Sequence, residues 1–298
     1  MILGNNNIDA SILNILDSYI AQVEKAFEEK EIIADIISYT GIIEDSLNTK
    51  FREFIEIKRN DNETKKDTLV IILETGGGSA RAVEKMVNIV RYHYKELYFV
   101  IPDYAMSAGT IFSMAGDKIY MDYSSSLGPV DPQVQNDKGQ WIPALGYIDK
   151  VNELIEKSKY NNMSDAEFLT FQKLDLGTIR SYEQAKELSV DLLKTWLVKY
   201  KFKNWETHRT TRVGEEVTKE EKEELAEHIA EQLSDNNRWH SHGRYINIDT
   251  LRELKLEIED YSEEDELRKA IISYNNLLKE FVQKMQRAIF FHTRLNKE

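Results

Sequence analysis

Cysteine is absent from the 298-residue sequence, and its absence excludes several kinds of chemistry at once. Disulfide bonds, thiolate nucleophiles and cysteine-containing metal sites all require it. Long apolar runs are also missing, since none approaches the roughly 20 residues that a membrane-spanning helix needs. No Lys or Arg precedes Lys25, so the basic start of a signal peptide is not expected. We therefore expect a soluble cytoplasmic protein with no membrane span.

Basic residues are scarce relative to acidic ones. The chain has 39 Lys and Arg against 52 Asp and Glu, which gives a formal net charge of −13. A protein whose main task is to hold nucleic acid needs a basic face, so a nucleic-acid partner is not expected. The 41% of hydrophobic residues can bury a sizeable core. The length allows one large domain or a domain with helical additions.

Proline and glycine are also scarce, and their distribution is uneven. All four prolines and eight of the thirteen glycines fall between residues 76 and 146. Such residues concentrate where the backbone must turn sharply, adopt a positive φ or approach a ligand closely. A functional site is therefore expected within this window.

Three short apolar runs predict buried strands of a mainly parallel sheet. They are Thr68–Leu73 (TLVIIL), Leu97–Ile101 (LYFVI) and Lys118–Met121 (KIYM). A helical stripe of apolar residues follows Ser79, and a short apolar helix is expected over Ala108–Ala115. Strands that alternate with helices in this way are typical of βαβ units and an α/β fold.

The regions on either side of this core are expected to be helical. Apolar residues recur at helical spacing from Ile8 to about residue 60, with Gly41 between two helices. After Gly146 the remaining 152 residues contain three glycines and no proline. The predicted organisation is an N-terminal helical segment (1–64), a catalytic core (65–146) and a helical C-terminal region (147–298). This last region is expected to complete the site and to form the oligomer interface.

Ser107 is the candidate nucleophile. It follows the strand that ends at Ile101 and opens the short apolar helix, within the sequence YAMSAGT. The small neighbours Ala105 and Ala108 let a substrate carbonyl come close, as in the G-x-S-x-G elbow, and a helix N-terminus favours a developing oxyanion. Because Ala105 replaces the first glycine of that elbow, an alternative in which Ser107 merely caps the helix stays open.

A glycine loop, Thr75–Ser79 (TGGGS), follows the preceding strand. Loops after successive parallel strands lie at the same edge of the sheet, so this loop can face Ser107. A glycine backbone N–H of this loop, Gly76 to Gly78, could then supply a second oxyanion donor. The loop has neither G-K-[ST] nor G-x-G-x-x-G, so no nucleotide cofactor is expected, and a plain tight turn is the alternative.

A rigid segment, Leu127–Gln133 (LGPVDPQ), follows the third strand. Two prolines on either side of Asp131 suit the fixing of a carboxylate or of a substrate strand. A surface turn is the alternative reading of the same residues.

The ordered motifs TGGGSA, AMSAGT, DKIYMD and LGPVDPQ resemble the serine dehydrogenase proteinase family. This family lies within the ClpP and signal peptide peptidase A group of serine proteases with the crotonase-type fold, and the resemblance covers roughly residues 65 to 145. It implies Ser107 as nucleophile and the N–H groups of Gly77 and Ala108 as the oxyanion hole. It also implies a core of stacked ββα units, a peptide or protein substrate, no cofactor and a homo-oligomer.

The general base is where the chain departs from the family pattern. ClpP-type enzymes carry a histidine in the segment that here contains Asp131. A carboxylate with the usual pKa of about 4 is a poor base toward a serine hydroxyl. The signal-peptide-peptidase-like members use a lysine, which makes Lys150 the first candidate base and Lys138, in a polar loop, a weaker one.

His240 and His242, in the sequence RWHSHGR, are the second candidates for the base. They could complete the site, bind an anion or form a metal pair, although two ligands at this spacing are a weak metal signal. We expect a Ser107–Lys150 pair first, a pair of Ser107 with one of these histidines second, and no metal.

The predicted function is that of a cytoplasmic serine peptidase that cleaves peptide bonds through an acyl-enzyme on Ser107. A crotonase-like acyl-thioester enzyme is one alternative, and it would bind coenzyme A thioesters independently of Ser107. A non-catalytic assembly or adaptor protein of the same fold is the other. For this last alternative, an amphipathic helix over about residues 266–292 offers a surface for another subunit.

Overall fold

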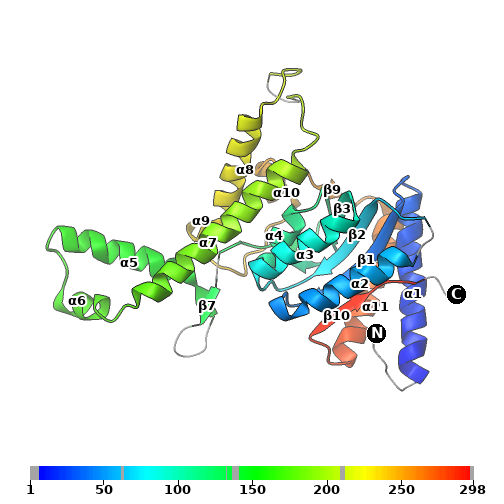
Figure 1. Cartoon of the computed structure of the whole chain (residues 1–298), viewed down its shortest axis with the longest axis horizontal. Helices are drawn as coiled ribbons and strands as arrows, with labels where there is room; N and C mark the ends of the chain where they lie inside the picture. The colour runs from blue at the N-terminus through cyan, green and yellow to red at the C-terminus, as the bar shows by residue number, and fades with distance from the viewer. Residues whose placement is uncertain (1–6, 62–63, 132, 136–140, 209–211, 296–298) are drawn as a thin grey trace.

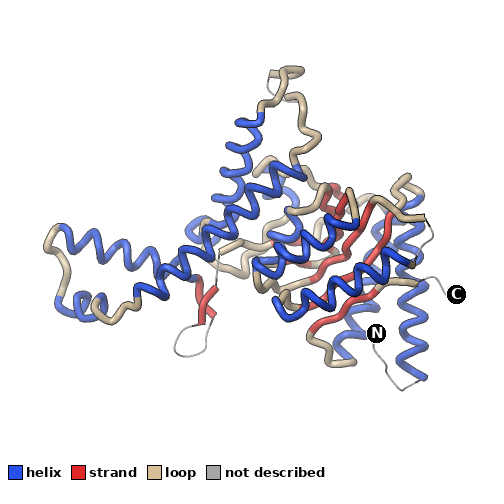
Figure 2. The backbone as a smooth tube through the Cα atoms, viewed as in Figure 1, coloured by secondary structure: helices blue, strands red, loops and turns tan. Residues whose placement is uncertain are grey.

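The centre of the molecule is a six-stranded sheet with the strand order β10-β1-β2-β3-β5-β9. Its strands lie side by side in the computed structural model (Figure 1, and red in Figure 2), which describes residues 7–61, 64–131, 133–135, 141–208 and 212–295. The strands are β1 (Ala34–Gly41), β2 (Thr68–Glu74), β3 (Glu96–Ile101), β5 (Lys118–Met121), β9 (Glu259–Asp260) and β10 (Ile289–His292).

The sheet is mainly parallel. From β1 to β9 each strand pairs in parallel with the next one in the sheet, and β10 alone is added antiparallel, against β1. The predicted apolar runs form β2, β3 and β5, and helices connect them. The prediction of an α/β fold with a mainly parallel sheet is therefore confirmed.

The N-terminal region is not wholly helical, and the prediction of a helical segment over residues 1–64 is wrong for Ala34–Gly41. This stretch is β1, and its side chains Ile36 and Ile37 are fully buried on opposite faces of the sheet. Gly41 does not separate two helices. It adopts a φ of 122°, and the Ala288 carbonyl beside it leaves no room for a Cβ. The strand forms because both of its faces are covered, which local periodicity does not reveal.

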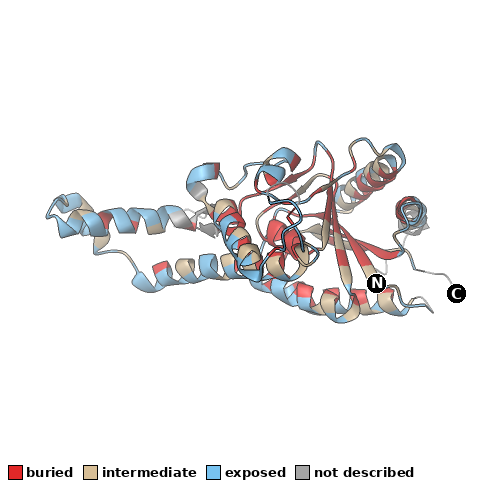
Figure 3. Cartoon of the chain, turned by 90° about the horizontal axis from the view of Figure 1, so that it is seen from above, coloured by how far each residue is buried: buried red, intermediate tan, exposed pale blue. Residues whose placement is uncertain are grey.

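Helices cover both faces of the sheet. The first face carries α2 (Asn48–Asn60), α3 (Ala80–His93) and α4 (Ala108–Met114), and the second carries α1 (Asn7–Glu28) and α11 (Asp265–Lys284). Alternate side chains of β2 divide between the two faces, since Ile71 packs with the residues of α3 while Ile72 packs with those of α11. Figure 3 shows the buried residues gathered on the sheet and on the inward sides of these helices.

The region after residue 143 is largely helical, and part of it projects away from the sheet (Figure 1, green). Its helices are α5 (Ala144–Lys159), α6 (Asp165–Phe171), α7 (Leu176–Trp196), α8 (Lys219–Ser234), α9 (Asn236–Trp239) and α10 (Ile248–Glu253). The predicted helix over 266–292 ends at Lys284, because the chain then turns into β10 and completes the sheet. No helix in the described part of the chain is both long and apolar enough to cross a bilayer.

Short elements complete the structure. They are the 3-10 turn η1 (Asp45–Leu47), the strands β4 (Tyr104–Ala105), β6 (Ser126–Leu127), β7 (Gln133–Gln135) and β8 (Trp141–Pro143), and the π-helical turn η2 (Leu197–Lys201). β4 pairs in parallel with β6, and β7 pairs antiparallel with β8. The small β4–β6 sheet lies beyond the carboxyl ends of the central strands, where Ser107 is found.

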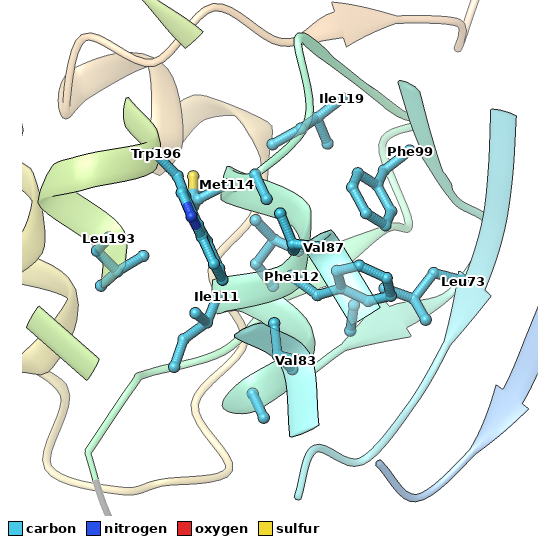
Figure 4. Close-up of a cluster of buried hydrophobic side chains, with 14 of the residues drawn as sticks. Leu73, Val83, Val87, Phe99, Ile111, Phe112, Met114, Ile119, Leu193 and Trp196 are labelled. Atoms are coloured by element: carbon cyan, nitrogen blue, oxygen red, sulfur yellow. The ribbon is translucent and has the colours of Figure 1, made fainter. Parts of the chain in front are cut away.

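The core fixes α4 from both sides (Figure 4). Phe112 points from α4 to the sheet, where its ring meets that of Phe99 edge-on at 4.8 Å between centroids. Trp196, at the end of α7, lies on the other side of α4, beside Ile111 and Met114. The C-terminal helical region therefore shares one core with the sheet, and it helps to hold the helix that begins at Ser107.

This packing leads to a prediction for stability. Trp196 is 5% exposed, so Trp196→Ala should remove a buried aromatic side chain, leave a cavity and lower the free energy of unfolding by about 3–5 kcal/mol. Tyr92→Ala is the matched control, because Tyr92 is 85% exposed and its loss should change the free energy of unfolding by no more than about 0.5 kcal/mol. Urea denaturation followed by circular dichroism measures both. Equal stability of the two variants would contradict the shared core.

Candidate active site

Two loops meet at the carboxyl edge of the sheet, after β2 and after β3. The backbone of Thr75 pairs with that of β4 in a parallel bridge to Ala105. Its N–H donates to the Tyr104 carbonyl oxygen at 3.1 Å, and its own carbonyl accepts from the Met106 N–H at 2.9 Å. The glycine loop and the serine turn are therefore joined by backbone hydrogen bonds, as parallel strands that end at one edge predict.

Ser107 occupies a strained turn at the start of α4. Its φ of 53° and ψ of −115° are unfavourable for a residue with a Cβ, and such strain is common at functional sites. The residue stands at the N-cap position of α4, yet its side chain makes no capping hydrogen bond. The alternative in which Ser107 serves as a helix cap is therefore not supported, since its hydroxyl makes no capping hydrogen bond to α4.

Gly77 lies directly against Ser107. It has a φ of 108°, and a Cβ at this position would come within 2.8 Å of the Ser107 Cβ and 3.4 Å of the Ala108 nitrogen. The Gly77 N–H donates to the Thr75 hydroxyl at 3.0 Å. Among the residues that the structure describes, no hydrogen bond engages the N–H of Gly78 or of Ala108. The loop thus brings its backbone close to the serine, as the sequence predicts.

Thr110 links the serine turn to the rigid segment after β6. Its hydroxyl lies 2.8 Å from the Gly128 carbonyl oxygen and 2.9 Å from the Ala105 carbonyl oxygen, either of which can accept its one proton, and the hydroxyl oxygen accepts from the Gly128 N–H at 3.0 Å. Gly128 also packs closely on Met106, whose Cα would lie 3.3 Å from a Cβ at this position. The segment that carries Asp131 is therefore held against the turn that carries Ser107.

Asp131, which is buried, and His242, whose side chain is 23% exposed, form a carboxylate–imidazole pair. His242 Nδ1 lies 2.8 Å from Asp131 Oδ1, and Asp131 is 1% exposed. An antiparallel bridge between Leu127 and Ile246 brings the two segments together. Asp131 lies four residues after Leu127, and His242 lies four residues before Ile246, so an antiparallel course places them opposite each other. The sequence identifies both residues as candidates but contains no signal that pairs them.

The other predicted base candidates lie elsewhere. Lys150 is on the exposed side of α5, where its ammonium group pairs with Glu153 at 2.8 Å. No contact found among the described residues joins it to Ser107. His240 is exposed and has a φ of 61°. Lys138 lies outside the described residues, as does Pro132. The role of Lys150 as general base therefore stays a prediction.

A buried acidic group stands directly before the glycine loop. Glu74 is 6% exposed, its carboxylate accepts from Asn275 Nδ2 at 3.2 Å, and Lys279 Nζ lies 3.6 Å away. Burial raises the pKa of Glu74, and the Lys279 charge opposes that rise. Lys279 also pairs with Asp103 at 2.5 Å, so it connects the ends of β2 and β3. In the sequence, Glu74 stands out as an acidic residue at the end of an apolar run, but no pattern points to Lys279.

Metal binding finds no support at this edge. The described residues contain no group of three or more His, Asp or Glu side chains arranged to hold a metal ion. His242 instead directs Nδ1 to a carboxylate, which leaves its Nε2 as the nitrogen for proton transfer. The structure thus places a serine at a strained turn beside the glycine loop, and a carboxylate–imidazole pair on the segment that Thr110 links to the same turn.

The closeness of Gly77 to Ser107 leads to a second prediction. Gly77→Ala should lower the free energy of unfolding by about 1–3 kcal/mol, because the new Cβ meets Ser107 and the positive φ disfavours alanine. Gly76→Ala is the matched control in the same loop, since nothing lies within 4 Å of its Cβ position. Thermal or urea unfolding of the two variants measures the difference. A loop in which both changes are equally tolerated would refute this packing.

Two curated proteins are similar to part of the chain. The chain is 37% identical over 99 residues to the uncharacterized protein MJ0137 of Methanocaldococcus jannaschii, and the match covers 33% of each chain. It is 33% identical over 124 residues to the uncharacterized protein MJ1495 of the same organism, covering 42% of this chain and 38% of that protein. The chain thus spans little more than a third of the length of these curated relatives.

Solved structures with a similar course include two mutants of the 1510-N membrane-bound stomatin-specific protease, one of them in complex with a substrate peptide. Each has a TM-score of 0.45 and 16% sequence identity. The matches cover 80% and 78% of this chain, and 83% and 77% of those chains.

The family model of the ClpP-like SDH-type serine proteinases matches residues 43–216, which is more than half of the chain. The matched range includes the glycine loop, Ser107, Asp131 and Lys150, whereas His242 lies beyond it. Together with the mainly parallel sheet, the match confirms the family resemblance of the sequence motifs. The chain belongs to the family of ClpP-like SDH-type serine proteinases.

Proposed function

We propose that the protein is a serine peptidase in which Ser107 attacks the carbonyl carbon of a peptide bond. The observation that carries the proposal is the position of Ser107, whose hydroxyl is not used as a helix cap and whose strained turn lies against Gly77. An exposed hydroxyl at a tight strand-to-helix turn is the arrangement of a nucleophile elbow. Family membership supports a peptide or protein substrate.

His242 is the base in this proposal, and Asp131 positions it. The support is the 2.8 Å hydrogen bond between them, together with the Thr110–Gly128 contacts that hold the Asp131 segment against the serine turn. A buried carboxylate on Nδ1 fixes the tautomer in which Nε2 accepts a proton, and it stabilises the imidazolium that forms. Lys150 is the second candidate for the base, and in this structure its ammonium group pairs with Glu153.

The reaction then proceeds in two balanced steps. In the first, the Ser107 hydroxyl gives its proton to His242, the Oγ–carbon bond forms, and the peptide C–N bond breaks as the leaving amine takes that proton. In the second, a water molecule gives a proton to His242 and attacks the acyl carbon. The ester bond breaks, and the proton returns to Ser107.

The oxyanion of each step is placed at the N-terminus of α4. The Ala108 N–H and the positive end of the α4 dipole point toward this position. The second donor is an N–H of the glycine loop, where that of Gly78 is uncommitted among the described residues and that of Gly77 is shared with the Thr75 hydroxyl. Two such donors are the usual means of stabilising a tetrahedral intermediate.

The assembly and setting belong to the same proposal. We place the protein in the cytoplasm, as a homo-oligomer, and its cysteine-free composition is consistent with a reducing compartment. The arm formed by α5, α6 and the first half of α7 supports the oligomer, because large apolar side chains are exposed along it. They are Tyr147, Ile155, Tyr160, Phe168, Leu169 and Leu176.

The nucleophile is tested by covalent labelling. A fluorophosphonate probe should modify the wild-type protein at Ser107, and Ser107→Ala should show no labelling, because its side chain lacks the attacking oxygen. Mass spectrometry of the labelled peptide identifies the site. Equal labelling of both proteins would disprove the assignment. Absence of any Ser107-dependent peptide turnover would favour the non-catalytic alternative, and coenzyme A thioester binding that survives Ser107→Ala would favour the acyl-thioester enzyme.

The base is tested by the rate of the same labelling. His242→Asn keeps a polar group near Asp131 but removes Nε2, and it should slow labelling by about 10²–10⁴-fold, the usual contribution of a general base. His240→Asn, two residues away and exposed, and Lys150→Met, on the arm, should label at the wild-type rate. A large loss in Lys150→Met with normal labelling of His242→Asn would replace the Ser–His–Asp assignment by a Ser–Lys pair.

A further inference from the structure

A cavity lies at the amino edge of the sheet, which is the edge opposite the one that carries Ser107. Its volume is about 900 Å³, and Glu96, Lys118 and Glu259, the first residues of β3, β5 and β9, line it. The six residues of β3 extend for about 20 Å, so the cavity is separated from the carboxyl edge by the length of the sheet. This volume lies in the range of small-molecule sites.

One wall of the cavity is built by an irregular end of α7. The helix does not finish in a regular turn but continues into the π-helical turn η2, which carries Tyr200 and Lys201 into the cavity. Phe202 and Trp205 follow, and their rings meet edge-on at 5.7 Å between centroids. Single π-turns are rare and frequently mark functional sites. The wall is therefore rich in aromatic side chains, with the Arg91 guanidinium over the Tyr200 ring at 3.7 Å and Trp205 half-buried at the cavity.

The charges around this wall are mostly paired with one another. Lys203 Nζ lies 2.6 Å from both Glu96 and Asp117, and Arg91 pairs with Asp117 at 2.9 Å. Lys118 pairs with Glu259 at 3.2 Å. The carboxylates at the amino edge therefore already have cationic partners.

Lys201 is the exception among these cations. Its ammonium group reaches the Asp117 carbonyl oxygen at 3.5 Å, and within the described part of the chain it takes part in no ion pair. Burial lowers the pKa of Lys201 to about 8, against the opposing effect of nearby carboxylates, so the group is still mostly protonated at pH 7. Lys201 is half-buried, and the nearby Asp117, Glu257 and Glu259 charges offset its desolvation only in part, so an anion in the cavity would stabilise its charged form further.

We propose that this cavity is a binding site for a small aromatic carboxylate, whose ring lies on the aromatic wall and whose carboxylate pairs with Lys201. A single negative charge fits best, because Lys118, Lys203, Arg212 and Arg252 already pair with carboxylates, Lys255 is exposed at the rim, and several acidic side chains line the same cavity. A dianionic phosphate would meet these carboxylates at greater cost. Neither Ser107 nor His242 lines the cavity, so the proposal stands apart from the peptidase assignment.

The test compares two ligands of equal shape. Binding of 2-naphthoate and of the neutral 2-naphthamide to the full chain is measured by isothermal titration calorimetry, with Ser107→Ala as the protein so that catalysis cannot interfere. The naphthoate should bind at least about tenfold more tightly, since a charge-assisted contact to Lys201 is available to it alone. Naphthyl phosphate should bind more weakly than the naphthoate.

Substitutions of Lys201 complete the test. Lys201→Gln should reduce the preference for naphthoate over naphthamide to less than about twofold, and Lys201→Arg should keep most of it. Lys199→Gln is the matched control, because Lys199 lies on the same turn but is exposed, and it should bind as the parent does. If circular dichroism shows that Lys201→Gln is unfolded, the naphthoate–naphthamide comparison and the Lys201→Arg variant still decide whether the cavity binds the carboxylate through a cation at position 201.

Three outcomes would overturn the proposal. They are the absence of binding by either ligand at millimolar concentration, equal affinity for both, and a charge preference that survives Lys201→Gln. None of these results bears on labelling of Ser107, so failure here and failure of the peptidase assignment are distinguishable.

Discussion

The contact between Gly77 and Ser107 is the constraint on which the candidate active site depends. A turn with a φ of 53° at Ser107 is unfavourable by itself, so it persists only because its surroundings determine it. The backbone hydrogen bonds between Thr75 and the segment Tyr104–Met106 hold the two loops in register. Any side chain at Gly77 would enter the space of the serine, which explains why a glycine stands there. The strained turn at Ser107 is thus supported by the loops that follow two neighbouring parallel strands.

The same constraint extends to the Asp131–His242 pair through Thr110. One threonine hydroxyl contacts both the serine turn and Gly128, so the position of Ser107 and the position of the Asp131 segment are set by a shared group. The Leu127–Ile246 bridge then carries His242 to Asp131. Residues that are 111 positions apart in the chain are thereby brought to a 2.8 Å contact. The C-terminal region is therefore not a mere addition to the core, since it brings an imidazole to it.

The sequence predicts the parts of the fold that local patterns determine. The runs of β2, β3 and β5 are short, apolar and flanked by turn residues, and Ser107 follows one of them, so their roles can be inferred from neighbours in the chain. β1 escapes such reasoning because its apolar residues are compatible with a helix, and only pairing with β2 on one side and β10 on the other decides for a strand. The Asp131–His242 pair cannot be inferred either, since it depends on a long-range bridge rather than on spacing. Resemblance to lysine-using relatives favours Lys150, but a resemblance contains no information on the contacts of that side chain.

The two edges of the sheet differ in the arrangement of their charged groups and in what each is proposed to bind. At the carboxyl edge, glycine and alanine backbone packs closely around Ser107, and the Glu74–Lys279–Asp103 cluster stands directly before the glycine loop; in the proposed mechanism the backbone N–H groups stabilise a transient negative charge. At the amino edge, Glu96, Asp117 and Lys203 form a fixed network that neutralises itself. A self-neutralised network has little to offer a ligand, so the capacity of that edge to bind one rests on the cation left outside the network. Lys201 occupies that position because the π-turn adds one residue to the last turn of α7 and directs the side chain inward.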